Sequence, residues 1–168
     1  MIGTILVVAL VVVLAGTVGA YALGVTDGVR DPAPNVAESE GQLVAEGDEQ
    51  IVVLTHVAGD RIEANEMEIV VDVDGASCTE TSRLVNLPSD GNLDPDNIDG
   101  PDIFDDQELA GAIEDGAPDD DGVWSAGDTI EIRIVSGECA LSAGDAVTVR
   151  IVHVPTNSIV VETTLTAG

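Results

Sequence analysis

The sequence contains no lysine and few aromatic residues. Its 168 residues include five basic side chains, all of them arginine, against 32 Asp and Glu, and the formal net charge is -27. This charge disfavours nucleic acid as a partner, because a polyanion repels the chain. Aromatic residues make up 2% of the sequence, which leaves few stacking platforms for sugars or bases. Since molar salt shortens the Debye length to about 3 Å, the acidity indicates adaptation to a very salty medium.

The sequence also lacks a motif for catalysis or metal binding. His56 and His153 lie in strand-like runs, and neither has a Ser, Cys or carboxylate at the spacing of a catalytic triad. Neither a glycine-rich phosphate loop nor a zinc-enzyme motif occurs. The acidic cluster 94–106 fails the spacing of an EF-hand, because Ile98 stands at the fifth position. We therefore expect no enzyme activity, no cofactor and no metal, and interpret the cluster as a hydrated acidic surface.

Charge is missing from one end of the chain. Residues 1–26 carry none, and residues 2–23 are almost entirely apolar. As a helix, such a run of about 22 residues would extend roughly 33 Å, which matches a bilayer core. It is too long for the apolar part of a secretory signal peptide and has no basic flank. We predict a long hydrophobic helix within residues 1–30, buried on every side by lipid or by other apolar helices.

Small residues recur along this run at helical spacing. Gly16, Ala20 and Gly24 stand four apart, and such spacing lets helix backbones approach one another closely. A membrane anchor that crosses once explains the length equally well, and its small residues would then have no packing role. The residues predicted to pack in an assembly are Ile2, Gly3, Leu6, Leu10, Leu14, Gly16, Ala20 and Gly24.

The remainder of the chain is patterned as strands. Pro32 and Pro34 predict a linker over residues 31–41, because proline ends a helix and favours extended backbone. Apolar and polar residues then alternate in short runs within 42–168, which is typical of half-buried strands. The strand-like runs are 51–57, 67–73, 82–86, 129–135, 146–154 and 158–165. The acidic stretch 86–122 does not fit this pattern and is predicted to be an irregular excursion with a short helix near 105–113.

These patterns together predict an α+β protein. The expected architecture is a long N-terminal hydrophobic helix followed by an antiparallel all-β head, built as an immunoglobulin-like β-sandwich.

A short internal repeat precedes two of the strands. Ser-Ala-Gly-Asp occurs at 125–128 and again at 142–145, and an arginine follows each at the same distance, Arg133 and Arg150. Two copies are too few for a solenoid. We interpret them as consecutive antiparallel strands that are entered through the same turn.

Cys78 and Cys139 are the only cysteines. A pair in an extracellular domain favours a disulfide, whereas two free thiols are the alternative. A metal site is disfavoured, because neither cysteine has a second Cys or a His at ligand spacing.

Two parts of the sequence resemble haloarchaeal type IV pilins. At the N-terminus, Ile2-Gly3-Thr4-Ile5-Leu6 and Tyr21-Ala22-Leu23-Gly24 are similar to the N-terminal domain of that family. In the head, the turn in Thr55-His56-Val57-Ala58-Gly59-Asp60 and the turn Trp124-Ser125-Ala126-Gly127-Asp128 are also similar to the family. One departure is that only Met1 precedes Ile2, where the family has a short basic leader.

The resemblance implies a subunit of an extracellular filament. In that family a prepilin peptidase removes the leader, and the apolar helix leaves the membrane and is assembled by the pilus machinery. The partners would then be copies of the same chain, and the filament would serve adhesion and biofilm formation. The alternatives are a membrane-anchored domain that binds a ligand at the cell surface and an archaellin-like subunit of a motility filament.

Overall fold

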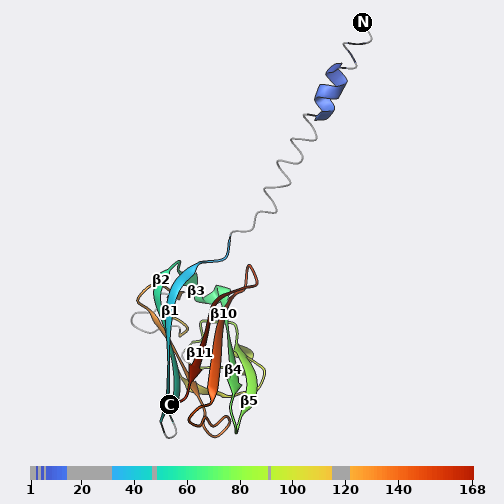
Figure 1. Ribbon diagram of the computed structural model, residues 1–168. Coiled ribbons are helices and arrows are strands. Elements are labelled where there is room, and N and C mark those ends of the chain that lie inside the picture. Colours follow the sequence, from blue (N-terminus) through green and yellow to red (C-terminus); the bar gives the residue numbers. More distant parts are fainter. Residues whose placement is uncertain are drawn as a thin grey trace. The chain divides into compact units, whose positions relative to one another are not determined.

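The computed structural model describes residues 3, 5, 7–14, 32–46, 49–90, 92–114 and 122–168. The chain divides into two compact units, Met1–Pro32 and Ala33–Gly168 (Figure 1). We call the second unit the head. Its described strands are β1 (Val36–Glu46), β2 (Glu49–Gly59), β3 (Ile62–Glu63), β4 (Met67–Asp74), β5 (Thr79–Leu84), β6 (Ile98–Asp99), β7 (Phe104–Gly111), β8 (Val123–Trp124), β9 (Thr129–Ile134), β10 (Ala146–His153) and β11 (Ser158–Thr166). Two short 3-10 helices are η1 (Ala64–Glu66) and η2 (Pro95–Asn97).

The strands of the head form two main sheets. One has the order β1-β2-β9-β7, the other has the order β11-β10-β4-β5-β6, and β3 and β8 form a small ribbon. Each pairing between these strands is antiparallel. In β4 and β10 buried residues alternate with half-exposed ones, as the sequence pattern predicted. The β-rich fold is therefore confirmed.

One core lies between the two sheets. The inward residues of the four-stranded sheet include Val52, Leu54 and Ile132, and those of the five-stranded sheet include Val71 and Val149; all five are 0% exposed. They belong to a single cluster of buried apolar residues. Burial of apolar surface stabilises a fold by about 25 cal/mol per Å². Because every second residue of these strands is apolar and faces inward, this burial holds the two sheets together.

Two edge strands, β1 and β11, come together where the sheets meet on one side. A Cβ atom placed on Gly41 of β1 would stand 2.9 Å from Leu165 Cδ2 and 3.2 Å from Thr163 Cγ2, both on β11. A larger residue at this position would therefore require the ends of these side chains to shift. The closure covers two edges that would otherwise expose unpaired backbone groups.

The long N-terminal helix is the part of the fold prediction that is wrong. In the N-terminal unit the continuous helical stretch among the described residues is 7–14, and strands account for 53% of the described chain. Within the same residues, no helix combines the length and the apolar character needed to cross a membrane. The stretch holds five valines, whose β-branched side chains lower helix propensity. Helices gain most of their stability by packing, whereas every residue of 7–14 is exposed.

Two further expectations are corrected in the head. β1 begins at Val36, inside the segment 31–41 that was expected to be a linker. As an edge strand it tolerates polar residues that would be excluded from a central strand, so its sequence lacks a clear strand pattern. The short helix expected near 105–113 is instead part of β7, because its backbone pairs with β9, Phe104 with Ile134 and Leu109 with Ile132.

Candidate functional site

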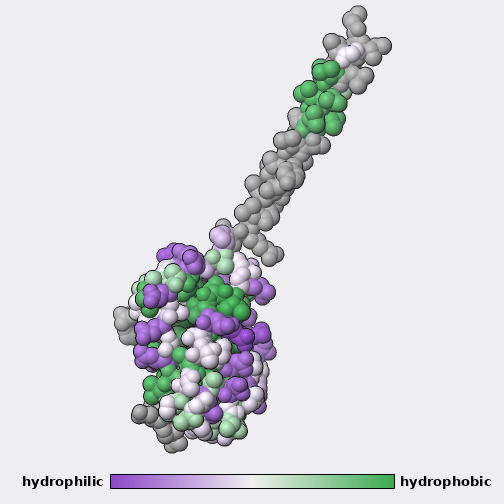
Figure 2. Space-filling model, viewed as in Figure 1, coloured by the Kyte–Doolittle hydropathy of each residue, from purple (hydrophilic) through white to green (hydrophobic). Residues whose placement is uncertain are grey.

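The described residues of the N-terminal unit expose an apolar surface. The exposed fractions are 63% for Val7, 59% for Leu10 and 64% for Val13, and every residue from 7 to 14 is exposed. Figure 2 shows this stretch as continuously green, whereas the visible surface of the head is mostly purple and white. An apolar surface on all sides of a helix indicates a site of interaction with lipid or with other apolar helices.

Three of the predicted packing residues lie within the described part of this unit. Leu10 and Leu14 are 59% and 55% exposed, and Gly3 has nothing within 4 Å of the position where a Cβ would stand. Their availability for a partner is consistent with a packing role but does not test it. The predicted packing residues that lie outside the described residues are Ile2, Leu6, Gly16, Ala20 and Gly24.

The predicted disulfide is confirmed. Cys78 and Cys139 are bonded, with 5.2 Å between their Cα atoms. Cys78 follows β4, and Cys139 lies between β9 and β10, so the bond ties the five-stranded sheet to a segment that leaves the four-stranded one. The two cysteines are 7% and 0% exposed, respectively. The bond is therefore a buried crosslink between the two layers.

A buried glutamine holds the segment that contains Cys139. Gln50 is 2% exposed, and its Nε2 donates hydrogen bonds to the carbonyls of Ile134 (3.1 Å) and Cys139 (2.9 Å). Its Oε1 accepts a hydrogen bond from the backbone N–H of Leu141. A buried backbone group without a partner is costly, so Gln50 stabilises a segment that has no strand to pair with. In the sequence, the one signal for this role is a lone polar residue before an apolar run.

The two Ser-Ala-Gly-Asp segments form the same turn. The carboxylate of Asp128 accepts a hydrogen bond from Ser125 N, and that of Asp145 accepts one from Ser142 N, both at 2.8 Å. Gly127 and Gly144 have φ angles of 105° and 96°. The shared turn chemistry is confirmed, but the strands that follow, β9 and β10, lie in different sheets and are not paired neighbours.

Both histidines are buried in the head. His56 is 0% exposed, its ring lies 4.8 Å from that of Trp124, and both its ring nitrogens lack a hydrogen-bond partner within the described residues. His153 is 6% exposed, with Nδ1 at 2.8 Å from Thr156 Oγ1 and Nε2 at 3.5 Å from a carboxylate oxygen of Glu66. The fold therefore encloses both rings for the most part.

The head has an open pocket of about 440 Å³ that is lined mainly by acidic side chains. Its walls are Asp102, Phe104, Asp105, Asp106, Val135 and Glu138. Asp105 also stands 3.8 Å from Arg133. In the part of the chain that the structure describes, no group of three or more His, Cys, Asp or Glu side chains is arranged to hold a metal ion.

No family model matches the chain, and no curated protein matches it. The exposed apolar stretch and the geometry of the head are therefore the observations from which a function can be argued.

Proposed function

We propose that this chain is the structural subunit of an extracellular filament of the type IV pilus kind, which assembles through its apolar N-terminal segment. The observation that carries the proposal is the exposed apolar surface of residues 7–14 in a chain of net charge -27. Water disfavours that surface, at about 25 cal/mol per Å² of apolar area, so it requires a partner. The resemblance of the N-terminus and of two head turns to haloarchaeal type IV pilins supports the same reading.

The partner of this surface changes during assembly. Before assembly the apolar segment lies in the membrane, and the resemblance implies that a prepilin peptidase processes the N-terminus there. The pilus machinery then transfers the segment from lipid to a core made of the same segment from other copies. The surface stays out of water in both states, and a head-to-tail contact that does not close produces an open helical array.

The head fits the outside of such a filament. The carboxylates of its acidic surface repel one another at low salt, and brine screens this repulsion. The Cys78–Cys139 bond suits an oxidising, extracellular setting. The filament would serve adhesion and biofilm formation, without enzyme activity.

Filament assembly tests the proposal. Leu10 is 59% exposed, so Leu10→Asp places a charge on the apolar surface without disturbing a packed core. We expect negative-stain microscopy of sheared surface material to find no filaments for this variant and normal filaments for the matched control Leu10→Ile. The proposal is wrong if wild-type material contains no filaments made of this chain, or if Leu10→Asp assembles like the control.

The open acidic pocket favours one alternative, a membrane-anchored domain that binds a ligand at the cell surface. Deletion of residues 1–24 separates the two functions. A shortened chain that still binds its ligand in solution favours the anchored binder, whereas loss of filaments with no retained binding favours the filament subunit.

A further inference from the structure

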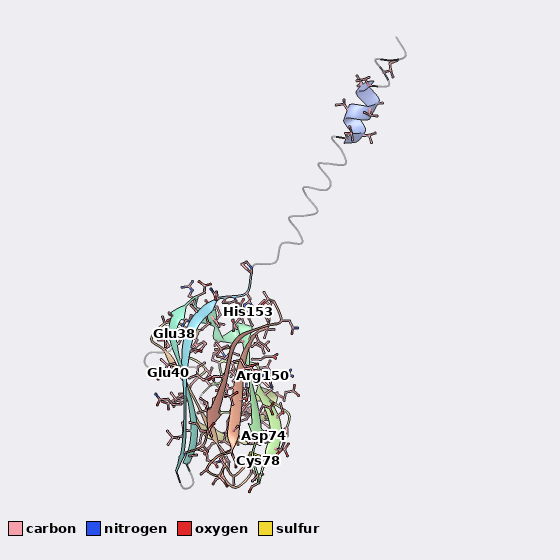
Figure 3. All side chains as sticks on the ribbon, in the orientation of Figure 1. Glu38, Glu40, Asp74, Cys78, Arg150 and His153 are labelled. Atoms are coloured by element: carbon pink, nitrogen blue, oxygen red, sulfur yellow. A yellow bond between two sulfur atoms is a disulfide. The ribbon has the colours of Figure 1, made fainter. Side chains whose placement is uncertain are left out.

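The ring of His153 lies between a hydroxyl and a carboxylate. Its Nδ1 is 2.8 Å from Thr156 Oγ1, and its Nε2 is 3.5 Å from a carboxylate oxygen of Glu66. Glu66 ends η1, whereas His153 ends β10 and Thr156 follows in the turn to β11. Figure 3 labels His153 near the end of the head where β1 begins. A hydroxyl, an imidazole and a carboxylate in this order are the parts of an activated nucleophile.

Backbone contacts hold these three side chains together. The N–H of Val154 donates a 2.8 Å hydrogen bond to the carbonyl of Glu66, which ties the turn after β10 to η1. The N–H of Asn157 donates a 3.1 Å hydrogen bond to the carbonyl of Val154 and closes the turn. His153 is opposite Met67 in the register of β10 and β4, and Met67 directly follows Glu66. The strand pairing therefore brings Glu66 beside the ring.

The carboxylate of Glu66 determines which nitrogen of His153 carries the proton. An ionised carboxylate only accepts hydrogen bonds, and in a neutral imidazole one nitrogen is a donor and the other is an acceptor. Because Glu66 lies beside Nε2, the proton is favoured on Nε2, and Nδ1 is left as the acceptor. The hydroxyl of Thr156 then donates to Nδ1, which is the direction in which its proton would be removed.

The base and the hydroxyl differ in their exposure. His153 is 6% exposed, so its ring is enclosed by the fold. Thr156 is partly exposed, and its two neighbours in the turn, Pro155 and Asn157, are exposed. A reagent in solution therefore has access to the turn, while the ring is held beneath it. His56 differs, because it is fully buried and its ring nitrogens have no hydrogen-bond partner among the described residues.

We infer that the hydroxyl of Thr156 is a nucleophile that accepts an acyl group from an ester, with His153 as its general base and Glu66 as a positioning residue. Thr156 Oγ1 attacks the carbonyl carbon of the ester, and the hydroxyl proton passes to His153 Nδ1. A bond forms between Oγ1 and that carbon, and the bond from the carbon to the leaving oxygen breaks. The proton then moves from Nδ1 to the leaving oxygen.

This step is a modification of the head. Each chain takes up one acyl group on one hydroxyl, so the reaction is stoichiometric. All three side chains belong to the head, so the site does not depend on the proposed filament or on the N-terminal segment.

The chain contains few nucleophiles that would compete in a test. It has no lysine, and its two cysteines are joined in the disulfide. The acyl donor is p-nitrophenyl acetate, and peptide mass spectrometry of the full-length chain locates the acetyl groups. Thr164 is the control within the same molecule. It is exposed on β11, and its hydroxyl lies 2.9 Å from that of Thr148 instead of an imidazole.

The rate of acetylation tests the nucleophile and its base. A positioned general base contributes about 100- to 10,000-fold, so we expect Thr156 to be acetylated about tenfold faster than Thr164, or more. Thr156→Val should remove the label, and Thr156→Ser should retain it. His153→Gln should slow the labelling of Thr156 to the rate of Thr164, with a urea midpoint to verify folding. Equal rates at the two threonines of the wild type, or unchanged labelling in folded His153→Gln, overturn the inference.

The position of the imidazole proton tests Glu66. Nitrogen-15 NMR reports which ring nitrogen is protonated, and the chain contains only two histidines. We expect the proton on Nε2 of His153 in the wild type, and a smaller share of this form and slower acetylation in Glu66→Gln. Glu63→Gln is the matched control, because it removes an exposed carboxylate from β3, and it should change neither. A proton on Nδ1 in the wild type, or equal effects of the two variants, overturns the assignment.

Discussion

The side chain of Gln50 donates a 2.9 Å hydrogen bond to the backbone carbonyl of Cys139. One buried amide thereby holds a half-cystine of the crosslink between the two sheets. Its other contacts, with Ile134 and Leu141, lie on either side of the same segment. The stability of this end of the head therefore depends on a small number of polar contacts as well as on the apolar core.

Removal of this amide should be costly. Gln50→Ala removes the side-chain partner of two buried backbone carbonyls and of one partly buried N–H, and we expect a loss of about 3 kcal/mol in the free energy of unfolding. Urea unfolding at fixed salt measures it. Gln42→Ala is the matched control, because Gln42 is exposed on β1, and its effect should stay within about 0.5 kcal/mol. Equal losses for the two variants would contradict the role given to Gln50.

Loss of the disulfide should destabilise the head further. The bond joins residues 61 apart in sequence, and the chain-entropy relation for a loop of that length gives about 4 kcal/mol. We expect the urea midpoint of the double variant Cys78→Ala, Cys139→Ala to fall accordingly. A reductant should lower the midpoint of the wild type and leave that of the double variant unchanged. A reductant effect of the same size on both proteins would assign the loss to something other than this bond.

The two Ser-Ala-Gly-Asp turns should contribute differently to the free energy of unfolding. Asp128 holds its own turn, through hydrogen bonds from Ser125 N (2.8 Å) and Ser125 Oγ (2.7 Å). Asp145 is 8% exposed and also accepts a hydrogen bond from Ala76 N (3.1 Å), in the turn after β4. We expect Asp145→Ala to cost about 3 kcal/mol and Asp128→Ala about half as much, because charged hydrogen bonds in buried sites are stronger.

Denaturant unfolding of both variants under one set of conditions measures this difference. Each variant acts as the control for the other, since the turns share their sequence. A larger loss for Asp128→Ala would show that the long-range contact of Asp145 contributes little.

Salt should stabilise the whole chain. At a net charge of -27 the folded chain repels itself, and screening increases as the Debye length falls from about 10 Å at 0.1 M to about 3 Å at 1 M. We expect the urea midpoint to rise steadily between these concentrations. Sodium and potassium chloride should act alike, because screening by monovalent ions does not depend on which cation is present. An unchanged midpoint would contradict the interpretation of the acidity.

The strands with strict alternation were predictable, and those without it were not. In β4, inward residues such as Ile69 and Val71 are fully buried between the sheets, so burial and pattern agree. β1 was missed because an edge strand accepts residues such as Glu38 and Gly41. β7 was expected to be a helix, since a short run with few apolar residues fits either period, and pairing with β9 decides it.

The prediction of a long helix failed for a related reason. Length and hydropathy describe what a segment would gain by burial, but they do not supply the partner that keeps it helical. The resemblance to type IV pilins depends in part on the same residues, and the function that it implies stays a proposal.

By itself the sequence determined the strongly acidic composition, the uncharged N-terminal segment and the period-two strands, because each follows from residue type and spacing along the chain. Only the tertiary structure decided which strands share a sheet, that Gln50 and Asp145 support the disulfide end, and that Glu66 lies beside His153. Those outcomes depend on contacts between residues far apart in sequence. Such contacts depend on how the sheets pack, and the local sequence pattern does not predict that packing.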